Sequence, residues 1–179
     1  VDESDLMAIF AGTHGPANGL DAVLNAAYEL QRRNREDIKI VLIGQGKLKD
    51  TLKRKASKLN LTNVIFHDPV DKNRLAGLMQ SADLGLQILT NVPAFYTGTS
   101  PNKFFDYISA GLPVLTNYPG WIADMISANQ CGFAIEPNNP SKFADVMEVA
   151  SNDRNYLKTM GTNSLSLARR EFDLSLIHI

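Results

Sequence analysis

The chain has 179 residues, of which 44% are hydrophobic and 21% are charged, and its formal net charge is -1. This length suits one domain with a hydrophobic core of its own. The even balance of charge excludes the strongly basic surface that proteins binding nucleic acid or anionic membranes present.

The cysteine count, the length of the apolar runs and the two ends of the chain narrow the class of protein further. A single cysteine, Cys131, excludes an internal disulfide, and its apolar surroundings predict a buried structural thiol in a reducing compartment. No apolar run approaches the ~20 residues of a membrane-spanning helix, and no signal peptide opens the chain. The polar lead at 1–6 and the apolar end at 170–179 lead us to expect a fragment of a longer protein.

Short apolar runs alternate with amphipathic segments along the chain. After Leu20, apolar residues recur every three or four positions, which is helix spacing, and Gly111 stops the helix that Ser100 opens. In chain order, the predicted strands are 7–12, 38–44, 63–66, 83–89, 112–116 and 132–136. The predicted helices are 20–30, 48–59, 71–79, 100–110, a short one from 121, 140–150 and 153–170.

This order makes six β–α units in succession. Apolar strands alternating with helices predict an α/β fold, with a parallel sheet covered on both faces and right-handed crossovers. The longest segment without a predicted element, 90–99, is typical of a functional loop in a compact domain. Ligands of such sheets bind beyond the carboxyl ends of the strands, so the strand-to-helix loops are the segments to inspect.

The first of these loops is rich in glycine. Gly12 and Gly15 allow the backbone to turn tightly and approach a ligand, and His14 between them can donate to an anion. The spacing matches neither a dinucleotide fingerprint nor a Walker A loop. A plain turn with an exposed histidine is the alternative.

The second loop carries glycine followed by positive charge. Gly44 ends a predicted strand, and Lys47 and Lys49 stand at the start of the next helix. Amide groups and a cation in this arrangement can face a phosphate. A solvated helix start explains the same pattern.

The third loop, 66–72, offers backbone groups on either side of Pro69 that suit the edge of a flat base. The alternative is a turn before a helix that Asp71 caps.

The fourth loop leads into the stretch "SPNKFFDY". Ser100 is predicted to cap a helix whose first amides and positive dipole end suit a diphosphate, and Lys103 adds a charge. Asn102 and Asp106 are four residues apart and share a face. The Asp106 carboxylate can there accept hydrogen bonds from a ribose diol, whereas the aromatic pair 104–105 is interpreted as core.

No metal site is predicted. The histidines at 14, 67 and 178 stand in separate contexts, and no paired spacing of histidine or cysteine ligands occurs. We therefore expect neither a metal nor a cofactor.

Several motifs in order carry a resemblance to a known family. They are "VLIGQGKLKDTL", "NVIFHDPV", "LAGLMQSADLGL", "SPNKFFDYISAGLPVL" and "GFAIEPNNP". Together they resemble the C-terminal, nucleotide-sugar-binding domain of retaining group 1 glycosyltransferases, from about residue 7 to residue 172. The combination is specific, although each piece alone is weak.

This resemblance implies a Rossmann-like, three-layer, doubly wound parallel sheet of about six strands, which is one half of a GT-B enzyme. Residues 1–179 would then form a single nucleotide-sugar-binding domain that lacks the N-terminal acceptor domain. The "SPNKFFDY" variant resembles bacterial enzymes that transfer sugars or amino sugars in surface-polysaccharide assembly.

The family places two acidic residues, with seven residues between them, against the donor. The second matches Asp106, which would bind the ribose hydroxyls. The first falls at Gly98, which has no carboxylate, so backbone amides at Thr99 and Ser100 are expected to replace part of that contact. The position whose backbone reads the nucleobase matches Val70.

The family also has a Gly-Arg and a Lys-Gly that neutralise the diphosphate. Those positions read Thr13 and Asn18 here, so the charge is expected from elsewhere. The candidates are His14, Lys47, Lys49 and Lys103. Of these, Lys103 and His14 are the expected catalytic groups.

The implied activity is transfer of a hexose or N-acetylhexosamine from a nucleoside-diphosphate sugar, expected to be UDP-linked, to a glycan or lipid-linked acceptor. The resemblance implies retention of configuration, no required metal and no nucleic-acid partner. It also implies a cytoplasmic protein, with attachment at the inner face of the cell membrane left open. The chain alone is expected to bind a nucleotide weakly and to transfer nothing.

Three other interpretations stay open. A sugar-nucleotide epimerase shares the fold and the ligand class but not the "SPNK" order. A flavodoxin-like receiver would need acidic residues at strand ends that here read Gly12, Gly44 and His67. A transferase-like domain that only binds nucleotide is suggested by the missing carboxylate at Gly98.

Overall fold

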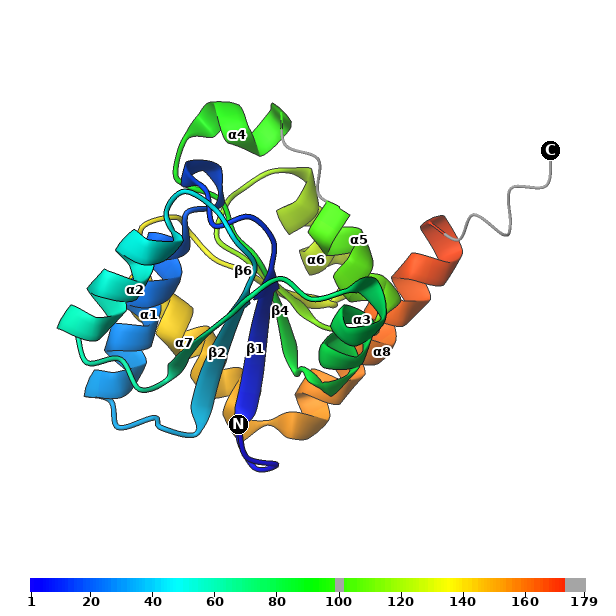
Figure 1. Ribbon diagram of the computed structural model, residues 1–179. Helices are drawn as coiled ribbons and strands as arrows, with labels where there is room; N and C mark the ends of the chain where they lie inside the picture. Colours follow the sequence, from blue (N-terminus) through cyan, green and yellow to red (C-terminus); the bar gives the residue numbers. More distant parts are fainter. Residues whose placement is uncertain (99–101, 173–179) are drawn as a thin grey trace.

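The computed structural model describes residues 1–98 and 102–172. Its strands form a single parallel sheet in the order β3-β2-β1-β4-β5-β6. Figure 1 labels β2, β1, β4 and β6 of this sheet. The strands are β1 (Leu6–Ala11), β2 (Ile38–Ile43), β3 (Val64–His67), β4 (Leu84–Gln87), β5 (Val114–Thr116) and β6 (Gly132–Ala134). The order runs outward in both directions from the β1–β4 pair, which confirms the expected doubly wound sheet.

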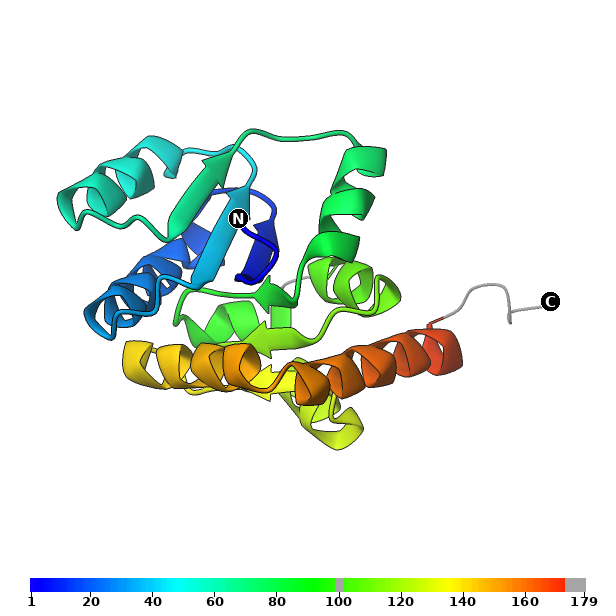
Figure 2. The ribbon, with the colours of Figure 1, turned by 90° about the horizontal axis from the view of Figure 1, so that it is seen from below.

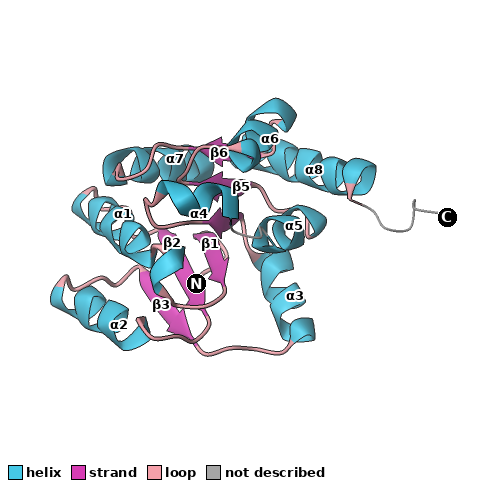
Figure 3. Cartoon of the chain, turned by 90° about the horizontal axis from the view of Figure 1, so that it is seen from above, coloured by secondary structure: helices cyan, strands magenta, loops and turns pink. Residues whose placement is uncertain are grey.

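Helices cover both faces of this sheet (Figure 3). On one face lie α1 (Leu20–Arg32), α2 (Lys49–Lys58) and α7 (Pro140–Asn152). On the other lie α3 (Lys72–Ser81), α5 (Asn102–Ser109), α6 (Trp121–Asn129) and most of α8 (Arg154–Glu171). A short 3-10 helix, η1 (Pro16–Asn18), and α4 (Pro93–Gly98) lie near the carboxyl ends of the strands.

Strand β1 contributes apolar side chains to the cores on both faces of the sheet. Residues 6, 8 and 10 pack into the core under α1, α2 and α7, whereas residues 7, 9 and 11 pack into the opposite core. Successive side chains of a strand point to opposite faces, so an uninterrupted apolar run is what a doubly covered strand requires.

The last two helices follow one another end to end (Figure 2). Leu157 near the start of α8 packs in the first core and Leu167 near its end packs in the second. Helix α8 therefore ties the two cores together past the edge of the sheet.

Side-chain caps begin the helices where the sequence predicts. The carboxylate of Asp71 accepts from the backbone N–H of Arg74 at 2.9 Å, and the Asn139 side chain accepts from the N–H of Lys142 at 2.9 Å. Asp153 caps α8 in the same way. Each cap satisfies an amide that the first helical turn leaves free.

One predicted loop is partly helical. Helix α4 lies within 90–99, where no element was predicted, and the tyrosine ring of Tyr96 stacks on that of Tyr118 with centroids 5.5 Å apart. The Tyr96 hydroxyl also bonds the side chain of Asn91. These contacts stabilise a turn that local sequence alone does not specify. The predicted cap Ser100 and the adjoining Pro101 lie outside the described residues.

The predicted burial of Cys131 is confirmed. Its side chain is fully buried, and burial raises the pKa of the thiol to about 11. Among the described residues, no helix is both long enough and apolar enough to cross a bilayer.

Candidate functional site

Backbone hydrogen bonds join the first three strand-to-helix loops at the carboxyl edge of the sheet. The N–H of His14 donates to the carbonyl of Gln45 at 2.9 Å, and the N–H of Leu48 donates back to the carbonyl of His14 at 2.9 Å. The N–H of Gly44 donates to the carbonyl of His67 at 3.1 Å. The loops therefore form one continuous wall.

Glycine is required in this wall because backbones approach closely. A Cβ on Gly44 would lie 1.9 Å from the carbonyl oxygen of Gly12, and the φ of Gly44 is 148°. A Cβ on Gly46 would lie 2.7 Å from the backbone of His14. Neither position accepts a side chain without displacing the neighbouring loop.

A cavity of about 360 Å³ opens beside this wall, between the ends of β1 and β2 and the start of α3. It is lined by Ala11, Gly12, Thr13, Ile43, Gly44, Gln45, Pro69, Val70 and Leu75. The structure thus brings together the predicted residues Gly12, Gly44 and Val70. The volume lies within the range of pockets for small ligands, about 300 to 1,000 Å³.

The ammonium of Lys49 is held inside the wall. Its Nζ donates to the carbonyl of Gly44 at 2.8 Å, to the carbonyl of His67 at 3.1 Å and to the carboxylate of Asp68 at 2.6 Å. This ion pair lowers the pKa of Asp68. An ammonium has three protons, so these bonds leave Lys49 none for a phosphate in this arrangement. The lysine that sequence reasoning placed on the ligand instead joins strand ends.

His14 is buried beneath the first loop, not exposed upon it. Its ring lies 6.2 Å from the ring of Phe10 and 6.2 Å from the ring of Phe66, between centroids. Neither ring nitrogen has a hydrogen-bond partner among the described residues. Burial, and then the nearby charges of Lys49 and Lys53, lower the pKa of His14, so the ring is neutral at pH 7.

Lys103 reaches from α5 to the first loop. Its Nζ lies 3.4 Å from the side-chain oxygen of Asn18 and 5.2 Å from the centre of the Phe10 ring. It would also lie 3.4 Å from a Cβ on Gly12. Burial lowers the pKa of Lys103, against the attraction of Asp106. A half-buried cation with few partners is thereby positioned beside Gly12.

Asp106 lies one turn further along α5 and is exposed. Although the residue is exposed overall, partial burial of its carboxyl raises the pKa of Asp106, and the charges of Lys103 and Lys72 oppose this. Lys72 begins α3, whose first turn borders the cavity. The Asp106 carboxylate therefore interacts electrostatically with one lysine of α5 and one lysine of α3. Asn102 is exposed on α5.

Of the remaining predicted residues, two lie in the first and second loops, one ends α4, and two lie outside the described residues. Gly15 precedes η1 in the first loop, and Lys47 is exposed in the second loop. Gly98 ends α4, and apart from its chain neighbours and its own helix backbone no atom of the described residues lies within 4 Å of where a Cβ on it would stand. Thr99 and Ser100 lie outside the described residues, so their predicted contacts stay predictions.

Tyr107 is a supporting residue that sequence reasoning missed. Its hydroxyl, fully buried, accepts from the N–H of Ala11 at 3.3 Å and lies 3.3 Å from the carbonyls of Ile9 and Leu86. It anchors α5 against the ends of β1 and β4. The sequence analysis assigned the neighbouring pair 104–105 to the core, but nothing in the sequence marked the Tyr107 hydroxyl as an anchor.

No group of three or more histidine, cysteine, aspartate or glutamate side chains within 1–98 and 102–172 is arranged to hold a metal ion.

Comparison with known proteins identifies the family of the chain. A family model described as "Glycosyl transferases group 1" matches residues 1–166. The structure is similar to WaaG, a glycosyltransferase involved in lipopolysaccharide biosynthesis, with a TM-score of 0.77 and 25% identity over 96% of this chain and 44% of WaaG. No curated protein sequence matches.

Two further structures share the fold. HepE of Anabaena, solved with UDP-glucose, has a TM-score of 0.78 and 17% identity over 94% of this chain and 45% of its own. The C-terminal domain of LpcC from Francisella tularensis has a TM-score of 0.74 and 16% identity over 95% of this chain and 87% of that domain. This chain therefore spans less than half the length of WaaG and HepE. With its Rossmann-like sheet and a family match along most of its length, the chain belongs to the group 1 glycosyl transferases.

Proposed function

We propose that residues 1–179 form one nucleotide-sugar-binding domain, and that the whole protein transfers a sugar from a UDP-linked donor. The observation that carries this proposal is the cavity at the ends of β1 and β2, with the Lys103 ammonium beside Gly12 at its rim. UDP is the nucleotide of choice because HepE was solved with UDP-glucose and TarM of S. aureus with UDP.

In this proposal the base enters the cavity. Pro69 and Val70 form one side of it, and Gly12 and Gly44 the other. A flat base can contact apolar walls while its edge bonds the backbone of Val70. The Asp106 carboxylate then accepts hydrogen bonds from the ribose hydroxyls.

The diphosphate lies over the first loop. Lys103 supplies the positive charge that the family takes from a lysine at the position of Asn18, and Asn18 is the residue that its ammonium contacts. Lys47 adds charge from the neighbouring loop, and the amides of Gly15, Thr99 and Ser100 donate hydrogen bonds. His14 stays in the proposal as a neutral donor, because its lowered pKa excludes a cation at pH 7.

The chemistry follows from this placement. The bond between the sugar C1 and the diphosphate oxygen breaks, and its electron pair stays on the leaving phosphate. Lys103 and the amide dipoles stabilise that growing negative charge. The acceptor oxygen bonds C1 on the face that the diphosphate leaves, so configuration is retained, and its proton passes to the leaving phosphate.

A domain that binds nucleotide without transfer is the second candidate. Gly98 stands where the family has a carboxylate for the donor sugar, and no atom of the described chain fills the space beside it. Turnover of donor by the full-length protein, with a glycan or lipid-linked acceptor, would remove this candidate.

The proposal leaves the acceptor to a further domain. The isolated chain should therefore bind UDP and transfer no sugar from UDP-glucose or UDP-N-acetylglucosamine to any acceptor. Substantial transfer by the isolated chain would contradict this division of labour.

Backbone amide NMR of the chain with UDP tests the binding site. The largest shifts are expected at Gly12, Gly44 and Val70, because these residues line the cavity. Shifts confined to the opposite edge of the sheet, at the amino ends of the strands, would overturn the proposal.

A further inference from the structure

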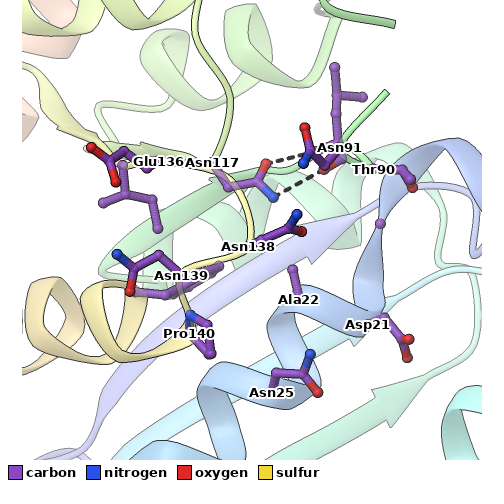
Figure 4. A pocket seen from close by; sticks show the side chains of 14 residues that line it. Asp21, Ala22, Asn25, Thr90, Asn91, Asn117, Glu136, Asn138, Asn139 and Pro140 are labelled. Carbon is purple, nitrogen blue, oxygen red and sulfur yellow. Dashed lines mark hydrogen bonds between the residues drawn. The ribbon is translucent and has the colours of Figure 1, made fainter. Parts of the chain in front are cut away.

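A second cavity opens at the same edge of the sheet, beyond the ends of β4, β5 and β6 (Figure 4). Its volume is about 420 Å³. The start of α1, the loop after β4, Asn117 after β5 and the β6–α7 loop surround it. None of its lining residues lines the first cavity, so the proposed nucleotide site leaves it unassigned.

Asparagine side chains from separate elements line this second cavity, and the protein already engages their oxygens. The Asn25 oxygen accepts from the Lys55 ammonium at 2.9 Å, and the Asn139 oxygen accepts from the N–H of Lys142 at 2.9 Å. The Asn91 oxygen accepts from the hydroxyl of Tyr96. Each amide is thereby oriented with its NH₂ group left as a donor.

Asn117 is fixed more firmly. Its oxygen accepts from the N–H of Leu89 at 2.9 Å and its NH₂ donates to the carbonyl of Leu89 at 3.0 Å, the two bonds drawn in Figure 4. The side chain is buried, and one amide hydrogen remains uncommitted. This residue holds the loop after β4 in place and contributes a preoriented donor.

The charged side chains that line the cavity disfavour an anion. Glu136 and Asp21 both line it, and Asp21 is paired with Lys55 at 3.0 Å. The residues that line it within the described chain include no lysine, arginine or histidine. A phosphate would meet the Glu136 carboxylate without a compensating cation on the wall.

Donors, a carboxylate acceptor and an apolar floor occur together here. The floor is made by Leu89, Ile135 and Phe143. A pyranose presents hydroxyls, which both donate and accept, around a ring with apolar C–H faces. We propose that this second cavity binds a neutral sugar unit that is not part of the nucleotide.

The test uses the 179-residue chain with isotope-labelled asparagine, observed by NMR without nucleotide. Methyl α-glucopyranoside and N-acetylglucosamine are the probes, and inorganic phosphate is the comparison. Either sugar is expected to shift the side-chain NH₂ signals of Asn25, Asn117 and Asn139, whereas phosphate should not. Absence of shifts with both sugars, or shifts with phosphate alone, would overturn the proposal.

Two variants locate the effect. Ala22→Phe places a ring in the cavity and should abolish the sugar-induced shifts, whereas Ala76→Phe on the exposed side of α3 should leave them intact. Glu136→Ala changes only an exposed side chain and should weaken sugar binding without affecting folding. Shifts that persist unchanged in both Ala22→Phe and Glu136→Ala would also contradict the proposal. UDP affinity, measured on the same samples, reports on the first cavity separately.

Discussion

Lys49 and Lys103 carry the same charge at the same edge of the sheet, but the protein positions them differently. The Lys49 ammonium bonds two strand-end carbonyls and a carboxylate, whereas within the described residues the Lys103 ammonium has the long contact with Asn18 and the ring of Phe10 nearby. The first lysine therefore supports the wall of the cavity, and the second is available to an anionic ligand.

Replacing each lysine by methionine separates these roles. Lys49→Met removes the side-chain donor of the Gly44 carbonyl and one of the two donors of the His67 carbonyl, which should cost about 1 to 3 kcal/mol of unfolding free energy. Lys103→Met should leave the melting temperature nearly unchanged and weaken UDP binding by about 1.5 to 3 kcal/mol, the range for a charged hydrogen bond. Thermal melts and calorimetry on both variants check this, and a reversed pattern would show that the assignment is wrong.

His14 predicts a pH dependence of stability. Its pKa in the folded protein lies below the value of about 6.5 in an unfolded chain. The unfolded state therefore takes up the proton first, and stability falls as pH drops from about 6.5 to the lowered pKa of the folded state. His14→Phe removes the titrating group and should flatten this part of the profile.

Chemical unfolding of wild type and His14→Phe between pH 7 and pH 5 checks the expectation. His67→Gln is the matched control, since it retains His14 and should retain the loss of stability. Identical pH profiles for wild type and His14→Phe would remove the role given to this ring.

At the scale of elements, the helix caps were readable from the sequence because each depends on local contacts. Asp71 caps the helix that follows it, as predicted, and Asn139 caps the helix whose predicted start is residue 140. Helix α4 was not predicted, because Tyr96 is fixed by Tyr118, which lies more than twenty residues away in the sequence. Contacts of this kind leave no periodic pattern in a short segment.

Two caps provide a matched pair of variants. Asp71→Ala and Asp153→Ala should each lower stability by about 0.5 to 2 kcal/mol, since each removes an N-cap hydrogen bond. Asp71 directly follows Val70 at the first cavity, whereas Asp153 begins α8 away from it. UDP affinity should therefore fall in Asp71→Ala only, as measured by calorimetry beside thermal melts. Equal UDP affinities in the two variants would show that the start of α3 is not part of the nucleotide site.

At the scale of the whole molecule, the sequence predicted the sheet and its parallel strands, and it placed the candidate site residues at the edge where two cavities open. It did not predict how that edge divides into two cavities. The second cavity joins Asp21, Thr90, Asn117 and Glu136, which are far apart in the chain and belong to no common motif. The burial of His14 was likewise hidden, because a histidine between glycines is typical of an exposed turn.

The positions at which this chain lacks a residue of the family are also easier to interpret in the whole structure. Asn18 replaces a lysine of the resembling family, and the structure brings Lys103 from α5 to the same place. No such substitute stands beside Gly98 among the described residues, where the space near its Cα is open. We therefore expect the contacts to the diphosphate to resemble those of the family more closely than the contacts to the donor sugar do.

Calorimetric titration of the chain with UDP, alongside GDP and ADP, tests the central claim most directly. We predict binding heat with UDP, and an affinity lower by about 1 to 3 kcal/mol in Asp106→Ala, because the carboxylate there is assigned to the ribose hydroxyls. No heat with any of the three nucleotides would contradict the account of this chain as a nucleotide-sugar-binding domain.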